Sequence, residues 1–256
     1  MSAEAAPAGR RLLITGAARG IGAATARLAA ARGWAVGVNY RARAEAARGL
    51  AAEIAAAGGA AAALKADVAD ASAIAPLFDA AEAALGGPLD AVVVNAGVLG
   101  PRAPLSERPL EDIDRLLAVN VRGALLTARE AARRLSAEGR SGDRSILFVS
   151  STASRLGSGG EFVDYAAGKG ALDTATRGLA AELGPSGVRV NAVRPGLIET
   201  EMQADSGWPE RAETMGRAAP LGRAGRAEEV ATAILWLLSA EASYVSGALL
   251  DVSGGR

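Results

Sequence analysis

Short apolar runs alternate along the chain with longer alanine-rich segments of helical period. The apolar runs are expected to form strands, at 11–16, 34–40, 61–67, 89–97, 144–151, 188–196 and 247–255. The segments between them are expected to form helices, at 20–32, 41–57, 72–84, 109–137, 161–184 and 228–240. Several strands are apolar on both faces, as happens when helices cover both sides of a parallel sheet. The pattern therefore predicts an α/β fold with a doubly wound sheet and helices on both faces.

Two segments depart from this alternation. Residues 1–10 have no apolar period, and we expect a disordered N-terminal tail there. Residues 199–220 contain two methionines, a tryptophan and two prolines without a clean period, which indicates a mobile segment over a substrate site. Since no change of composition marks a second domain, residues 11–256 are predicted to form a single domain.

Charge and composition narrow the partners. Basic and acidic residues balance at 28 each, which argues against a nucleic-acid or anionic-membrane partner. No apolar run reaches the roughly 18 residues of a membrane span, and the first residues lack a signal-peptide pattern. We therefore expect a cytoplasmic protein with a small-molecule substrate. The chain has neither cysteine nor histidine, so we predict no metal site.

Three glycines, Gly16, Gly20 and Gly22, stand where the first predicted strand meets the first predicted helix. Glycines at this junction allow a tight turn and a close approach to a pyrophosphate, which the helix N-terminus attracts. The spacing is G-x-x-x-G-x-G, and a turn without a ligand is the alternative interpretation. Its place between strand and helix favours the dinucleotide site of a Rossmann fold.

The end of the second predicted strand bears on the choice of cofactor. A site that prefers NAD usually carries an acid there to bind the ribose 2′-hydroxyl, but this chain has Asn39, Tyr40 and Arg41. Arg19 in the glycine turn and Arg41 are both placed to hold a 2′-phosphate. We predict NADP as the cofactor, with NAD as a weaker alternative. Two arginines that are only surface charges would be the other explanation.

Tyr165 and Lys169 are the candidates for proton chemistry. Four residues apart on a predicted helix, they would share one face at about 5–6 Å. Only two of the 28 basic residues are lysine, so a lysine here indicates that a compact ammonium is needed. The ammonium is expected to lower the pKa of the phenol, which lets Tyr165 act as acid or base without histidine. Lys169 is also a candidate to hold the nicotinamide ribose.

Six motifs in order resemble the short-chain dehydrogenase/reductase family over essentially the full length. They are TGAARGIG at 15–22, NAG at 95–97, VNVRG at 119–123, VSS at 149–151, YAAGK at 165–169 and RPGLIET at 194–200. The resemblance implies a Rossmann fold with one sheet of seven parallel strands in the order 3-2-1-4-5-6-7. It also implies hydride transfer with NAD(P) and a homotetramer.

The resemblance assigns roles residue by residue. Ser151 becomes the donor to the substrate oxygen, with the adjacent Ser150 as an alternative, and Tyr165 becomes the acid/base with Lys169 as its partner. Asn120 would hold, through its main chain, a water that links Lys169 to solvent. Further residues implied at the cofactor are Ile21, Asp67, Val68, Asn95, Ala96, Gly97, Pro195, Gly196, Ile198 and Thr200. Turn, cap and loop roles are the alternatives for these residues.

The leading hypothesis is an NADP(H)-dependent oxidoreductase that interconverts a carbonyl and a secondary alcohol. A 3-oxoacyl thioester reductase and a sugar or polyol dehydrogenase are alternatives, and a non-catalytic NADP sensor or scaffold is a different class. Candidates for the substrate wall are Phe162, Met202, Trp208 and Met215, with polar contacts from Glu161 and Arg211. Gly168 is unexpected, because glycine inside a helix costs about 1 kcal/mol relative to alanine.

Overall fold

A seven-stranded parallel sheet forms the centre of the protein, which is described by a computed structural model over residues 9–202, 206–208 and 210–256. Its strands run in the order β3-β2-β1-β4-β5-β6-β9, and every neighbouring pair is parallel. They are β1 (Arg11–Ile14), β2 (Ala35–Tyr40), β3 (Ala60–Lys65), β4 (Ala91–Val94), β5 (Arg144–Val149), β6 (Val188–Pro195) and β9 (Leu249–Val252). The predicted order is confirmed, with β9 as the seventh strand of the sheet.

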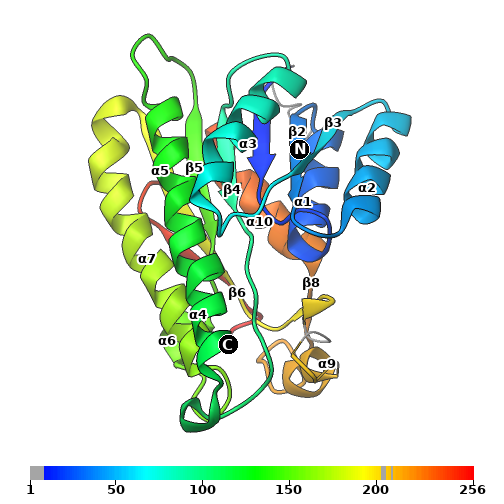
Figure 1. The fold of residues 1–256 in the computed structure, drawn as a ribbon, viewed down its shortest axis with the longest axis vertical. Coiled ribbons are helices and arrows are strands. Elements are labelled where there is room, and N and C mark those ends of the chain that lie inside the picture. The colour runs from blue at the N-terminus through cyan, green and yellow to red at the C-terminus, as the bar shows by residue number, and fades with distance from the viewer. Residues whose placement is uncertain (1–8, 203–205, 209) are drawn as a thin grey trace.

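Helices cover both faces of the sheet, as the two-sided apolar pattern of the strands predicts (Figure 1). One face packs against α1 (Gly20–Ala31), α2 (Ala44–Ala56) and α10 (Ala227–Leu237). The other face packs against α3 (Ala71–Ala84), α5 (Ala124–Leu135) and α7 (Val163–Leu183). Alternate residues of each strand therefore enter two different cores, which lets a strand be apolar throughout.

The single helix predicted at 109–137 is wrong in its middle. The structure has α4 (Leu110–Leu117), a π-helical segment η2 (Ala118–Gly123) and then α5. Two close approaches to other segments occur within the wide turn. The Asn120 side chain is bound to the backbone of Val98, and a Cβ on Gly123 would lie 2.8 Å from the Val68 carbonyl oxygen. Such π-helical turns often occur at functional sites.

The segment predicted to be mobile, 199–220, contains regular structure at both ends. Next to it, β7 (Ile198–Glu199) pairs with β8 (Gly225–Arg226), and α9 (Arg211–Gly216) lies within it beyond the ends of the sheet strands (Figure 1). Residues 203–205 and 209 lie outside the described residues. The remaining short elements are η1 (Leu105–Glu107), α6 (Ala153–Leu156), η3 (Gly184–Ser186) and η4 (Ala240–Ala242). The mobility of the segment stays a prediction.

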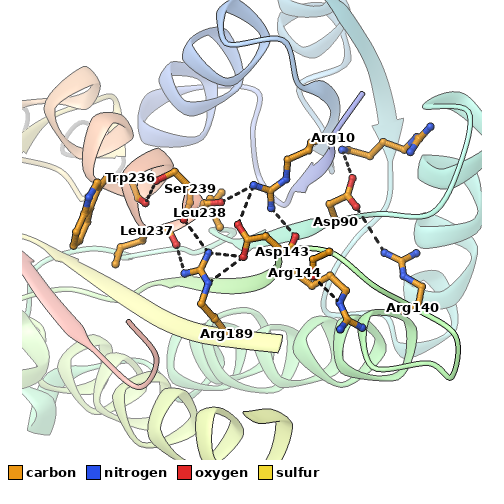
Figure 2. Close-up of polar contacts among 12 residues, drawn as sticks. Arg10, Asp90, Arg140, Asp143, Arg144, Arg189, Trp236, Leu237, Leu238 and Ser239 are labelled. Atoms are coloured by element: carbon orange, nitrogen blue, oxygen red, sulfur yellow. Dashed lines mark hydrogen bonds and ion pairs between the residues drawn. The ribbon is translucent and has the colours of Figure 1, made fainter. Parts of the chain in front are cut away.

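Arginines form hydrogen bonds and ion pairs at the end of the sheet where the strands begin (Figure 2). Arg10 donates to Asp143 at 3.1 Å and to the Leu238 carbonyl at 2.9 Å, and Arg189 donates to Asp143 and to the Leu237 carbonyl. These carbonyls belong to the C-terminal turn of α10, where positive charge is favourable. Of the predicted disordered stretch 1–10, residues 1–8 lie outside the described residues, whereas Arg10 is bound into the fold. The cleft lies at the opposite end of the sheet, where the carboxyl ends of the strands are located.

Candidate active site

A single cleft at the carboxyl ends of the strands brings together most of the residues predicted from the sequence. The predicted residues that line it are Gly16, Arg19, Gly20, Ile21, Asn39, Tyr40, Arg41, Asp67, Val68, Asn95, Ala96, Gly97, Ser150, Ser151, Tyr165, Lys169, Pro195, Gly196, Ile198 and Thr200. Gly22 and Asn120 lie behind its wall, where they pack against lining residues. A parallel α/β sheet is expected to bind its ligand at this edge.

The glycine turn is packed too closely for a side chain at two of its glycines. Gly16 has φ +63°, and a Cβ there would lie 2.8 Å from the Ala96 Cα. A Cβ on Gly22 would lie 2.7 Å from the side-chain nitrogen of Asn95, which donates to the Thr15 carbonyl at 2.8 Å. The turn is therefore held tightly against the end of β4, with its backbone at the start of α1. This cradle suits the pyrophosphate of a dinucleotide.

Three arginines gather at the end of the cleft next to β2. Arg19, Arg41 and Arg43 all line it, and Arg41 lies 3.9 Å from the Asp67 carboxylate. Arg43 is not among the cofactor residues predicted from the sequence, although it stands only two residues beyond Arg41. A guanidinium is the side chain best suited to hold a phosphate, so these arginines are the candidates for contact with a 2′-phosphate.

The Asn39 side chain braces the glycine turn. It is buried, accepts from the Gly16 amide at 3.1 Å and donates to the carbonyls of Leu64 and Ala66. Asn39 therefore ties the glycine turn to the end of β3. Asn39 also lines the cleft, and its contact with a cofactor stays a prediction.

The geometry distinguishes the two candidate serines. The Ser150 hydroxyl is buried and donates to Asp173 at 2.6 Å. The Ser151 hydroxyl lines the cleft, accepts from the Ala153 amide at 3.1 Å and is close enough to the Tyr165 phenol to act on its pKa, which it lowers. Of the two, Ser151 is thus the one that acts on the tyrosine.

The electrostatics of Tyr165 differ from the sequence-based expectation. Burial raises the pKa of the Tyr165 phenol, and the opposing effects of the Ser151 hydrogen bond and the Arg211 charge are smaller. The net shift is opposite to the predicted lowering by Lys169. Lys169 Nζ lies 5.6 Å from the centre of the tyrosine ring and donates to the Val149 carbonyl at 2.7 Å. Its ammonium therefore lies over the ring and is bound to β5, while burial removes solvent from the phenol.

Lys169 is almost fully buried, and this lowers its own pKa from 10.5 to about 8. Asp173, one turn further along α7, opposes the shift. Asp173 also accepts from the Ser150 and Ser154 hydroxyls at 2.6 and 2.7 Å. Tyr165, Lys169 and Asp173 follow one another at four-residue spacing, so one face of α7 carries all three.

Asn120 connects the π-helical turn to the end of β4. Its amide oxygen accepts from the Val98 amide at 2.8 Å, and its amide nitrogen donates to the Val98 carbonyl at 2.7 Å. A Cβ on Gly97 would lie 3.4 Å from the Asn120 oxygen and 3.7 Å from Lys169 Nζ. The side chain thus fixes the loop beneath Lys169. The predicted water on the Asn120 main chain stays a prediction.

The wall beyond Tyr165 includes part of the predicted apolar set. Phe162 and Met202 line the cleft, and the Arg211 guanidinium carbon lies 4.9 Å from the Phe162 ring centre. Trp208 packs instead against Arg102, with 4.8 Å between the guanidinium carbon and the ring. Arg256 also lines the cleft and is a residue that sequence reasoning missed, since no motif includes it.

Within the described ranges, no cluster of three or more acidic residues is arranged to hold a metal ion. A search of the same residues finds no helix with the length and apolarity needed to cross a membrane.

Comparisons with known proteins agree with this geometry. A family model described as Enoyl-(Acyl carrier protein) reductase matches residues 16–256. The uncharacterized oxidoreductase YgfF of Escherichia coli K12 is 47% identical over 244 residues, covering 95% of this chain and 98% of its own. The chain belongs to the short-chain dehydrogenase/reductase family.

Two solved structures share the whole fold. A short-chain dehydrogenase from Burkholderia cenocepacia J2315 in complex with NADP has a TM-score of 0.88 and 36% identity, covering 97% of this chain and 98% of its own. A 3-ketoacyl-(acyl-carrier-protein) reductase from Brucella melitensis complexed with NADH has a TM-score of 0.88 and 32% identity, with the same coverage. The family assignment makes this protein an NAD(P)-dependent oxidoreductase of alcohols and carbonyls.

Proposed function

We propose that the enzyme interconverts a carbonyl and a secondary alcohol with NADP(H), using Tyr165 as the acid/base. The observation that carries the proposal is that Ser151, Tyr165 and the buried Lys169 come together in the lining of one cleft, with Ser151 close enough to act on the Tyr165 phenol. The glycine turn would hold the pyrophosphate of the cofactor, which supplies or accepts the hydride when bound. Gly97, Pro195 and the other predicted residues of the wall would border its ribose and nicotinamide.

The chain's own groups would handle the substrate oxygen. A raised pKa keeps the Tyr165 phenol protonated at neutral pH, so it can donate a hydrogen bond to a carbonyl oxygen. Ser151 would donate a second hydrogen bond to the same oxygen. As negative charge develops on that oxygen, both hydroxyls would stabilise it, and Tyr165 would deliver its proton. Lys169, held by its hydrogen bond to the Val149 carbonyl, would add positive charge behind the phenol.

Replacing Tyr165 with phenylalanine tests this assignment. We expect Tyr165→Phe to lower kcat/KM for carbonyl reduction by about 100-fold or more, because the proton donor is lost. Binding of NADPH, measured by calorimetry, is expected to change little. Tyr244→Phe is the matched control, because Tyr244 is fully exposed on the surface. Turnover by Tyr165→Phe within tenfold of the native enzyme would show that another group moves the proton.

The preference for NADP rests on the three arginines next to β2. Arg19, Arg41 and Arg43 would face the 2′-phosphate, and Arg41→Ala is expected to lower kcat/KM with NADPH more than with NADH. Because Asp67 lies beside Arg41, it would lose its cationic neighbour in this variant and would disfavour the phosphate further. If the ratio of kcat/KM with NADPH to kcat/KM with NADH is the same in Arg41→Ala and in the native enzyme, the assignment is contradicted.

The substrate remains open between a 3-oxoacyl thioester, a sugar or polyol, and a smaller ketone. A panel of these three classes, followed by NADPH absorbance with NADH alongside, separates them. The class that supports the highest kcat/KM identifies the substrate type.

A cytoplasmic location and a homotetramer stay predictions. Exposed leucines on α4 and α5 support assembly, because Leu110, Leu117 and Leu125 are 76%, 42% and 43% exposed. Sedimentation at the concentrations used for activity measures the assembly state, and a monomer would contradict the prediction.

A further inference from the structure

The buried side chain of Arg108 joins the loop that follows β4 to the start of α7. Its Nε donates to the Asp164 carboxylate at 2.8 Å, and its two terminal nitrogens donate to the carbonyl oxygens of Leu99, at 2.7 Å, and Pro101. The side chains of Arg108 and Asp164 are only 1% and 3% exposed. One guanidinium thus holds three acceptors that belong to two separate segments of the chain.

Both segments reach the catalytic part of the cleft. Leu99 lines the cleft, and Asp164 directly precedes Tyr165, which lines it too. The second oxygen of the Asp164 carboxylate accepts from the Tyr165 amide at 2.9 Å. That amide lies in the first turn of α7, where a negative charge is favourable. Asp164 therefore connects Arg108 to the backbone of the tyrosine.

The loop after β4 is packed closely around the guanidinium. Gly100 has φ +73°, and a Cβ there would lie 2.5 Å from a terminal nitrogen of Arg108. The Ala103 amide donates to the Glu161 carbonyl at 3.1 Å, which ties the same loop to the residues just before α7. The position of the Arg108 side chain therefore sets where Leu99 lies relative to α7.

A buried ion pair contributes little net stability compared with apolar side chains of similar size, although the loss of one partner is costly. What the three hydrogen bonds of Arg108 supply is a fixed geometry. We propose that Arg108, acting through Asp164, is a positioning residue that sets the place of the Tyr165 phenol relative to the cleft wall at Leu99. The proposal rests on the proposed function, in which Tyr165 moves the proton. A displacement of about 1 Å at a reacting group can lower a rate about 100-fold.

An Arg108→Lys variant tests the proposal, because a compact ammonium does not reproduce the three-point contact of the planar fork. We expect kcat/KM for carbonyl reduction to fall by about tenfold or more, while the Kd of NADPH changes little. Arg189→Lys is the matched control. Arg189 is also buried and donates to Asp143 at 2.9 Å and to the Leu237 carbonyl at 2.6 Å, at the other end of the sheet. We expect this control to lose stability but to keep kcat/KM per folded molecule, and equal losses of kcat/KM in the two variants would refute the proposal.

A second pair of variants leaves both charges in place and serves even if Arg108→Lys does not fold. Gly100→Ala would push the Arg108 guanidinium out of its place. Gly139 has a similar φ of +77° but nothing within 4 Å of a Cβ, so Gly139→Ala matches the backbone strain without the contact. We expect a lower kcat/KM for Gly100→Ala alone, and the same kcat/KM in both variants would contradict the positioning role.

Combining Arg108→Lys with Tyr165→Phe separates positioning of the phenol from other effects on the cleft. If Arg108 acts through the phenol, its replacement costs little more once the phenol is gone. Where Tyr165→Phe is impaired as expected, a further loss as large as the loss in the native background would show that Arg108 acts elsewhere.

A spectroscopic measurement does not depend on turnover. Enzyme labelled with carbon-13 at tyrosine Cζ gives three resonances, from Tyr40, Tyr165 and Tyr244, and Tyr165→Phe identifies the one from Tyr165. We expect that resonance to shift in Arg108→Lys and to stay in place in Arg189→Lys. If Tyr165→Phe keeps its turnover, only the proposed function fails, and the resonance alone decides the positioning role. A resonance that does not move in Arg108→Lys would overturn the positioning role while the proposed function stands.

Discussion

Lys169 is expected to lose its charge near pH 8 in the free enzyme. Its folded-state pKa of about 8 lies below the ordinary value of 10.5, mainly because the side chain is buried. The difference corresponds to about 3 kcal/mol against burying the charged form. This unfavourable contribution is present below pH 8 and disappears as the pH rises from about 8 to 10.5, because the unfolded state then binds more protons than the folded state. Stability attributable to Lys169 is therefore expected to increase over that window.

The sequence makes a direct measurement possible, because Lys65 and Lys169 are its only lysines. Enzyme labelled with carbon-13 at lysine Cε gives two resonances, and a Lys65→Arg variant leaves the resonance of Lys169 alone. We expect this resonance to titrate with a midpoint of about 8, so that Lys169 is about nine-tenths charged at pH 7 and about one-tenth charged at pH 9.

An Asp173→Asn variant tests the cause of the pKa. Asp173 opposes the effect of burial, so removal of its charge is expected to move the midpoint below that of the native enzyme. A native midpoint above 10 would refute the argument from burial. A midpoint that stays the same in Asp173→Asn would refute the assigned role of Asp173.

Three further substitutions test the packing around the site. Gly22→Ala is expected to weaken NADPH binding by about tenfold or more in calorimetry, because its Cβ would lie 2.7 Å from the side-chain nitrogen of Asn95. Unchanged affinity would contradict a tightly packed glycine turn. Gly168→Ala is expected to raise Tm by about 2–4 °C, because alanine favours the helix by about 1 kcal/mol. Its Cβ would meet its neighbours at 3.4 Å, an ordinary van der Waals distance. A fall in Tm would contradict that account. Asp164→Asn breaks a buried pair with Arg108, 2.8 Å apart, and is expected to lower the free energy of unfolding by about 3 kcal/mol in urea titrations; a loss below 1 kcal/mol would contradict it.

Much of the fold follows from local patterns. The order of apolar runs and helical segments predicts a parallel sheet covered on both faces, and the resemblance adds the order of its strands. The long segment at 109–137 shows the limit of such patterns. Its residues have the composition of one helix, but contacts of Asn120 with Val98 and of Gly123 with Val68 change the helical turn. Those partners are distant in sequence, so no local pattern shows them.

In the candidate site, too, the sequence predicts some features and not others. Gly16, Tyr165 and Lys169 can be read from the sequence, because a glycine turn and a tyrosine–lysine spacing are local features with a chemical meaning. The pKa shifts could not be read from it. The direction of the shift of Tyr165 depends on how much water reaches the phenol, which the packing of the whole cleft decides. That the Ser150 hydroxyl is bound to Asp173, whereas Ser151 acts on the tyrosine, also needed the structure.

The sequence by itself determined the class of fold, the family and the chemical types at the site, because these depend on residue identity and on spacing along the chain. Only the tertiary structure decided which polar atoms are already bound to one another and which face the cleft. The Asn39 side chain is bound to the glycine turn, for example, and Arg256 lines the cleft although no motif includes it. Hydrogen bonds and electric fields act through space, so residues far apart in the chain set them jointly.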